Sequence, residues 1–246
     1  MPRPIFDVRD TLYQSDDPVA AFVFDTKVAA VFADMIERSV PGYASIVGMI
    51  GTLAERYAQP SSRCYDLGCS LGAATLAMRH GIKAPGCSII AVDNSPAMIG
   101  RCEAVLREDT GGVPVQLLCA DLLDLPIENA SMVVLNFTLQ FVPLERRAAL
   151  LARIAQGLRP GGMLVLSEKI HFEDPALNAL FIDLHHRFKE QNGYSRTEIS
   201  RKRAAIENVL VPESLRTHEQ RVLAAGFSSC AVWFQCFNFA SMVAIK

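Results

Sequence analysis

The chain has 246 residues, of which half are hydrophobic and a fifth are charged, and its formal net charge is −2 at pH 7. This length and composition are typical of a large α/β domain, and they exclude an intrinsically disordered chain. The near-neutral charge gives no general attraction to phosphate backbones, so we expect no direct nucleic-acid partner.

The sequence also predicts the location of the protein. Residues 1–10 carry no secretory signal, and no apolar run reaches the roughly 18 residues that span a bilayer. The seven cysteines are scattered and include no Cys-x-x-Cys pair, which is typical of small core residues in a reducing compartment. We therefore expect a cytoplasmic protein without membrane contact and without a metal centre.

Helices come first, and an alternation of strands and helices follows. Apolar residues at helical spacing predict helices at 26–38 and 43–57, separated by Pro41-Gly42. Strands are expected at 64–67, 87–92, 115–119, 130–137 and 162–166, the last introduced by a loop at 159–162. Helices are expected at 73–79, after Ser95 as N-cap with Pro96 in the first turn, and at 145–158. The continuous apolar character of 87–92 favours a parallel strand covered on both faces.

The last part of the chain departs from this alternation. Two or three helices are expected within 175–225, Gly226 ends the last of them, and strands at 229–234 and 239–245 form a hairpin. A mostly parallel seven-stranded sheet that finishes with an antiparallel hairpin is the Rossmann-like fold of class I methyltransferases. We predict this α/β fold as a single domain over 1–246, with the following parts: an N-terminal helical region (1–60), a nucleoside-binding core (61–170), a helical insertion (171–225) and a C-terminal hairpin (226–246).

A glycine turn followed by an acid predicts a nucleoside site. The motif Asp66-Leu67-Gly68-Cys69-Ser70 reads as a strand, a turn whose backbone N–H groups face the crevice, and a helix start. Asp93 ends the next strand, where a carboxylate accepts both ribose hydroxyls. The third glycine of the dinucleotide motif is missing, so S-adenosylmethionine is the leading candidate. Cys69 has no neighbouring histidine and is expected to contribute its backbone rather than act as a nucleophile.

Two further polar residues follow later strands. Asp121 ends the third strand, where an adenine amino group would lie, and Asp124 is a competing acid in the same loop. Asn136 closes the apolar run at 130–137, and a polar group there needs a ligand or a satisfied core network. We therefore expect both strand ends to face the nucleoside.

Several long motifs resemble carboxy-S-adenosylmethionine synthases. They are Ser-Val-Pro-Gly-Tyr at 39–43, Tyr-Asp-Leu-Gly-Cys-Ser-Leu-Gly-Ala-Ala-Thr at 65–75, Asp-Asn-Ser-Pro-Ala-Met at 93–98, the run at 128–141, and Trp-Phe-Gln-Cys-Phe-Asn-Phe at 233–239. The similarity extends from about residue 24 to the C-terminus. It implies an enzyme that uses prephenate to carboxylate the sulfonium methyl group of S-adenosylmethionine and releases phenylpyruvate. The product would serve a separate enzyme that modifies a wobble uridine of tRNA.

The resemblance also implies a set of ligand contacts, and we expect a homodimer. Matched position by position, the contacts are Tyr43, Gly68, Cys69, Ser70, Asp93, Asn94, Asp121, Leu122, Asn136 and Arg203. Leu122 is a conservative variation that would act through its backbone. Prephenate would supply both carbon dioxide and, as its hydroxyl leaves, the base, so the chain need not provide a general base.

The most specific hypothesis concerns Arg203 and the anion that it binds. Ser195 and Glu198 form a capping-box pattern, and Arg203 then falls on an apolar stripe with Ile199 and Ile206. On this interpretation, Arg201 and Lys202 form a solvated face. A buried arginine needs an anion, which is either a core acid such as Glu168 or Asp183 or, as we propose, the transferred carboxyl group, reached in the same chain or across a dimer interface.

The sequence leaves open other candidate site residues and other functions. Ser167-Glu168-Lys169 end the fifth strand and could line the substrate pocket. Adjacent His185 and His186 point in different directions along a helix, which favours a surface or packing role over a shared metal. The alternatives to the synthase are an ordinary small-molecule methyltransferase and a non-catalytic nucleoside-binding protein.

Overall fold

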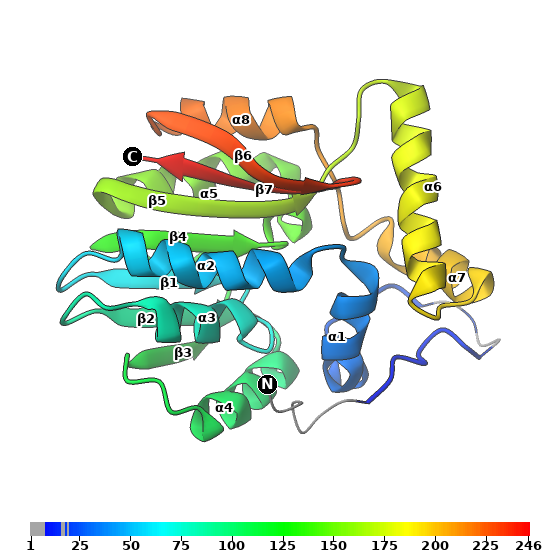
Figure 1. Cartoon of the computed structure of the whole chain (residues 1–246), viewed down its shortest axis with the longest axis horizontal. Coiled ribbons are helices and arrows are strands. Elements are labelled where there is room, and N and C mark those ends of the chain that lie inside the picture. The colour runs from blue at the N-terminus through cyan, green and yellow to red at the C-terminus, as the bar shows by residue number, and fades with distance from the viewer. Residues whose placement is uncertain (1–7, 16–17, 19) are drawn as a thin grey trace.

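The computed structural model describes residues 8–15, 18 and 20–246; the prediction about a secretory signal concerns a segment of which residues 1–7 lie outside this range. A seven-stranded sheet has the order β3-β2-β1-β4-β5-β7-β6 (Figure 1). Its strands are β1 (Arg63–Leu67), β2 (Ser88–Asp93), β3 (Val115–Cys119), β4 (Ala130–Asn136), β5 (Leu158–Lys169), β6 (Ser229–Cys236) and β7 (Phe239–Ile245). The predicted fold class is confirmed.

Apolar strands build the centre of the sheet. Strands β1 to β5 pair in parallel, whereas β7 runs antiparallel to both β5 and β6. Every residue of β4 before Asn136 is buried, because helices cover both faces of the sheet. The parallel strands therefore deliver their carboxyl ends to one common edge, as open α/β sheets do.

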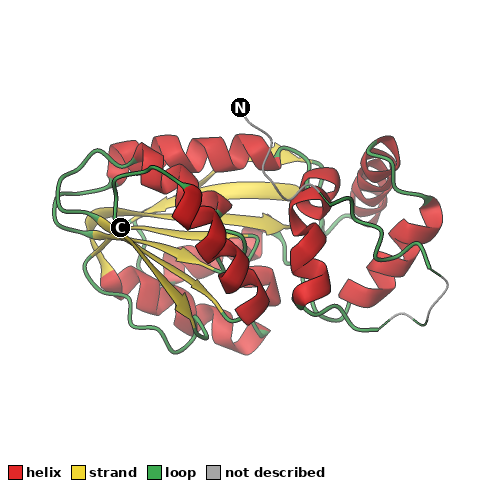
Figure 2. Ribbon diagram, turned by 90° about the horizontal axis from the view of Figure 1, so that it is seen from below, coloured by secondary structure: helices red, strands yellow, loops and turns green. Residues whose placement is uncertain are grey.

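The helices divide into two groups (Figure 2). Those that flank the sheet include α2 (Tyr43–Tyr57), α3 (Ala73–Gly81), α4 (Pro96–Glu108), α5 (Leu144–Gly157) and α8 (Leu215–Ala224). Beyond the carboxyl edge of the parallel strands lie α1 (Thr26–Ser39), α6 (Pro175–Gln191) and α7 (Arg196–Ile206). The short 3-10 helix η1 (Leu139–Phe141) follows β4. No helix in the described part of the chain has both the length and the apolar character that a bilayer crossing requires.

Local capping rules confirm several predicted helix ends. The Ser95 side chain accepts a hydrogen bond from the Met98 amide, with Pro96 in the first turn. Ser195 and Glu198 form the predicted capping box at the start of α7. Gly226 has a φ of 101° after α8, a conformation that glycine adopts without strain.

The predicted loop at 159–162 is wrong, because this segment belongs to β5. The Gly161 amide donates to the Lys246 carbonyl, and the Lys246 amide donates to the Gly162 carbonyl. A register shift in the pairing of β4 with β5 accommodates the segment. Pro-Gly-Gly is typical of a turn, but here the neighbouring C-terminal strand supplies partners that extend β5.

Candidate functional site

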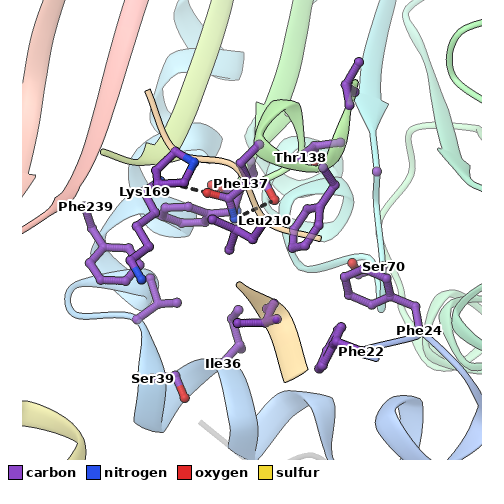
Figure 3. A pocket seen from close by; sticks show the side chains of 18 of the residues that line it. Phe22, Phe24, Ile36, Ser39, Ser70, Phe137, Thr138, Lys169, Leu210 and Phe239 are labelled. Atoms are coloured by element: carbon purple, nitrogen blue, oxygen red, sulfur yellow. Dashed lines mark hydrogen bonds between the residues drawn. The ribbon is translucent and has the colours of Figure 1, made fainter. Parts of the chain in front are cut away.

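A cavity of about 580 Å³ opens at the carboxyl edge of the parallel strands. This volume is typical of small-molecule sites, which range from about 300 to 1,000 Å³. Helices α1, α6 and α7 close it from the side opposite the sheet. Figure 3 shows Ser70, Phe22 and Phe24 on one side of the cavity and Lys169 and Phe239 on the other.

The structure brings every predicted site residue to this one cavity. The lining includes Tyr43, Gly68, Cys69, Ser70, Asp93, Asn94, Asp121, Leu122, Asn136 and Arg203. They come from the ends of four neighbouring parallel strands, from the start of α2 and from α7. The sequence therefore predicted their common location, while their roles in binding stay predictions.

The glycine turn differs in one respect from the prediction. The amides of Gly68 and Cys69 do not face the cavity as free donors, because both donate to the Val92 carbonyl at 2.8 and 2.9 Å. Gly68 has a φ of +83°, and a Cβ at this position would lie 2.5 Å from the Thr138 side chain. Gly68 thus lets β1 and the segment after β4 approach closely beside the cavity.

Replacing Gly68 with alanine is expected to destabilise the protein by about 2 kcal/mol. The positive φ costs roughly 1–2 kcal/mol in a residue with a Cβ, and the contact with Thr138 adds strain. Denaturant unfolding measures the change. Gly100→Ala is the matched control, because Gly100 lies inside α4 with nothing within 4 Å of its added Cβ and should gain about 0.5–1 kcal/mol. Equal stability of Gly68→Ala and the unmodified protein would contradict this account.

Asp93 links the glycine turn to the start of α4. Its Oδ2 accepts from the Ser70 amide at 2.9 Å, and its Oδ1 accepts from the Ser95 amide at 2.9 Å. Burial raises the pKa of this carboxyl group, and the backbone hydrogen bonds oppose that shift. Because each carboxylate oxygen has two acceptor directions, Asp93 can still accept from a ligand in the cavity.

Asp66 is a cavity residue that the sequence reasoning did not select. It is 1% exposed, and Thr75 Oγ1 donates to its Oδ2 at 2.5 Å. Burial raises its pKa to about 6. Burial and the neighbouring Asp66 also raise the pKa of Tyr43. The sequence pattern that could have identified Asp66 is an acid inside an otherwise apolar strand. A carboxylate buried there needs a hydrogen-bond partner or a ligand.

The polar residues at the ends of β3 and β4 differ in whether they reach the cavity. Asp121 lines the cavity, and its Oδ1 accepts from the Leu123 amide at 2.8 Å. Asp124 is exposed and is absent from the lining. Asn136 Oδ1 is buried without a hydrogen-bond partner among the described residues. Such an orphaned acceptor is rare in a folded protein and points to a donor on a ligand or a bound water.

Arg203 lies on α7 as predicted, but the prediction that it belongs to the buried apolar face of this helix is wrong. Arg203 is exposed, while Lys202 is the cation that packs inward, at 3.2 Å from Ser39 Oγ and 3.8 Å from Asp10 Oδ2. The buried face of α7 runs through Ile199, Lys202 and Ala205, which is about 100° away from Arg203 around the helix. Apolar spacing alone did not reveal which face α1 and the N-terminal segment would cover.

The other prediction for Arg203, a salt bridge with a core acid such as Glu168 or Asp183, is also excluded among the described residues. Within the described residues Arg203 has no ion pair, and Asp183 pairs instead with Arg187 at 2.9 Å. Glu168 is fully buried, and its Oε1 accepts from the Leu139 amide at 3.0 Å. Arg203 therefore lines the cavity without a protein anion among the described residues.

Basic side chains, lysine, arginine and histidine, gather on the side of the cavity formed by β5, α6 and α7. They are Lys169, His185, His186, Lys189, Lys202 and Arg203. The sequence left Lys169 unassigned, predicted a surface or packing role for both histidines, and gave no role to Lys189. Lys189 could have been identified from its spacing of four residues from His185, because this spacing places both side chains on one face of α6.

His185 packs inside this face of α6. Its Nε2 lies 2.8 Å from the Ser39 carbonyl, and its ring contacts Phe239 at a centroid distance of 4.8 Å. Burial, with Lys189 as the next contributor, lowers its pKa to about 2, so the ring is neutral at pH 7 and donates to Ser39. No group of metal-ligating side chains is found among the residues that the structure describes.

The strand order and the polar residues at adjacent strand ends define a class I S-adenosylmethionine-dependent methyltransferase fold. A family model described as a methyltransferase domain matches residues 65–162. Solved structures agree on the fold. An O-methyltransferase family protein from Burkholderia thailandensis has a TM-score of 0.63 at 19% identity, over 91% of this chain and 60% of that chain. Human N-acetylserotonin methyltransferase has a TM-score of 0.58 at 15% identity, over 90% of this chain and 55% of that chain.

Curated relatives narrow the class further. The carboxy-S-adenosyl-L-methionine synthase of Trichlorobacter lovleyi is 61% identical over 96% of this chain and 98% of its own length. The protein of the same name from Vibrio cholerae is 58% identical over 99% of this chain and 100% of its own length. The chain belongs to the carboxy-S-adenosyl-L-methionine synthase family.

Proposed function

We propose that this protein converts S-adenosyl-L-methionine to carboxy-S-adenosyl-L-methionine, with prephenate as the carboxyl donor and phenylpyruvate as the co-product. The product would supply the donor for carboxymethylation of a tRNA wobble uridine by another enzyme. The names of the full-length relatives support the carboxylated product. The observation that carries the proposal is Arg203, a cation at the nucleoside cavity with no acid partner among the described residues.

The residues around the cavity fit S-adenosylmethionine. Asp93 would accept the ribose hydroxyls, and Asp121 would accept from the adenine amino group. The orphaned Asn136 Oδ1 gives this fit independent support, because a ligand donor would satisfy it. Gly68, Cys69 and Ser70 shape the turn against which the nucleoside lies, and Tyr43, Asn94 and Leu122 complete the lining.

The reaction balances without a base from the chain. The sulfonium of S-adenosylmethionine acidifies its own methyl group, and prephenate supplies carbon dioxide as its ring aromatises. A new carbon–carbon bond joins the methyl carbon to the carboxyl carbon, and the methyl proton leaves with the prephenate hydroxyl as water. The protein's contribution is to hold both partners and to exclude water. Phe22, Phe24 and Phe137 form apolar walls for that purpose.

We also propose that the protein acts as a cytoplasmic homodimer of single-domain subunits, as a one-carbon transferase. Leu177 and Leu180 are exposed on α6, at 46% and 48%. Arg203 on the adjacent α7 is exposed as well. A second copy over these helices would cover the leucines and enclose the carboxylate end of the site, which supports the dimer.

Mass spectrometry of the nucleoside tests the proposed function. Purified protein is incubated with S-adenosylmethionine with and without prephenate, and nucleoside released from freshly isolated protein is weighed in parallel. A carboxylated nucleoside that forms only with prephenate supports the proposal. Methyl loss to an added acceptor would assign an ordinary methyltransferase, and retained binding without turnover would assign a non-catalytic nucleoside-binding protein.

A further inference from the structure

Two lysines in the cavity lack the partner that buried cations normally have. Lys189 on α6 is 8% exposed, and Lys169 at the end of β5 is half-buried. Neither ammonium group has an ion pair or a hydrogen bond among the described residues. Lys202, in contrast, lies close to Asp10 and Ser39. An unpaired buried ammonium group is costly, so its anion is expected to come from a ligand.

The two lysines act on each other within the same part of the cavity. Burial lowers the pKa of Lys189 to about 7, and Lys169 is the next contributor. Burial also lowers the pKa of Lys169, with Arg203 as the second cause. The backbone of Lys169 is fixed, because Gln140 Oε1 accepts from its amide at 2.9 Å. These cations therefore line one cavity and repel one another there.

The cavity is electrostatically divided. Its acids Asp66, Asp93 and Asp121 stand at the ends of β1, β2 and β3, on the side predicted for the nucleoside. Its cations stand on β5, α6 and α7, and the acid that joins them in the lining, Glu207, is exposed. Among the neighbours of Lys189, His185 is neutral and donates to Ser39. The basic side therefore suits an anion that is separate from the nucleoside.

We propose that Lys169 and Lys189 form a subsite for the 2-oxo-acid carboxylate of the co-substrate, the carboxylate that stays on the aromatic co-product after transfer. This assignment rests on the proposed function, in which Arg203 faces the other, transferred carboxyl group. Phe239 and Ile182 line the same side of the cavity and provide apolar surface for the ring. The two carboxylates of one donor would thus be held by different cations.

The subsite is tested with phenylpyruvate as the probe. Binding to the protein loaded with S-adenosylmethionine is measured by calorimetry for the unmodified chain, Lys169→Met and Lys189→Met. Each substitution removes a charged hydrogen bond, so phenylpyruvate affinity should fall roughly 10- to 100-fold while S-adenosylmethionine affinity is unchanged. The KM for prephenate should rise by a similar factor. Arg187→Gln is the matched control, because Arg187 is an exposed cation on α6 that pairs with Asp183.

Stability separates this role from a structural one. Without ligand, Lys189→Met should unfold at a higher temperature than the unmodified protein, because an unpaired buried charge is replaced by an apolar side chain. A lysine that supported the fold would give the opposite shift. Should a methionine variant fail to fold, Lys169→Gln and Lys189→Gln take its place, because glutamine also removes the charge and should lower phenylpyruvate affinity by a similar factor.

The outcomes distinguish the subsite from the proposed function. Unchanged phenylpyruvate affinity and unchanged prephenate KM in both lysine variants, with normal carboxylation by the unmodified chain, would overturn the subsite alone. Lysine-dependent binding of phenylpyruvate in a protein that forms no carboxylated nucleoside would overturn the proposed function and leave the subsite standing.

Discussion

Arg203→Leu is expected to reduce kcat/KM for carboxylation at least about 100-fold while S-adenosylmethionine still binds. Leucine keeps the apolar stem and removes the guanidinium group, so the developing carboxylate loses a charged hydrogen-bond donor. Loss of such a partner costs about 2–5 kcal/mol when the other charge is enclosed. Because the Arg203 side chain is exposed, the free energy of unfolding should change little.

Turnover is measured as carboxylated nucleoside by mass spectrometry, and binding is measured by calorimetry. Arg196→Leu is the matched control, because Arg196 lies on the same helix, is exposed and pairs with Glu190 at 2.9 Å. It should keep the turnover of the unmodified protein. Arg203→Lys should recover part of the activity, because lysine restores the charge but cannot form the bidentate hydrogen bonds of a guanidinium group. Normal product from Arg203→Leu would refute the assigned role.

Asp93→Asn is expected to weaken S-adenosylmethionine binding about 100-fold. The amide keeps the size of the side chain but turns one acceptor into a donor. In the structure the two carboxylate oxygens already accept from the Ser70 and Ser95 amides, so the amide NH₂ would face one backbone N–H group. Loss of a charged acceptor costs about 1.5–3 kcal/mol per hydrogen bond, and the ribose hydroxyls would lose theirs as well.

Calorimetric titration with S-adenosylmethionine measures the effect, and Asp124→Asn is the control. Asp124 is an exposed acid near Asp121 that does not line the cavity, so its replacement should leave the affinity unchanged. Thermal unfolding of Asp93→Asn should show a modest loss of stability from the backbone partners. Tight S-adenosylmethionine binding by Asp93→Asn would mean that the ribose lies elsewhere.

The sequence predicted those parts of the fold in which local and global preferences agree. Apolar runs such as β2 are buried on both faces, so their composition alone identifies them. Ser95 and Ser195 cap their helices through contacts within a few residues. The strand-end residues Gly68 and Asp93 reach the cavity because parallel strands share one edge.

The incorrect or missing predictions depend on contacts between distant parts of the chain. The segment at 159–162 extends β5 only because Lys246 lies beside it. Lys202 packs inward because its ammonium group lies close to Asp10 and Ser39, and both residues are remote in sequence. Lys189 looks like an ordinary surface lysine until α6 is placed against the end of α1 and against Phe239 of the C-terminal hairpin. Charged residues on late helices can therefore be interpreted only once the packing is known.

The electrostatic division of the cavity follows the order of the chain. The acidic wall is encoded between residues 66 and 121, and the basic wall between residues 169 and 203. On the proposed function, point changes in the later segment would alter the acid that is accepted without altering the strand ends that are predicted to face the nucleoside. Exchange of one helical segment would thus give a sheet of this kind a different transfer chemistry while its nucleoside ligand stays the same.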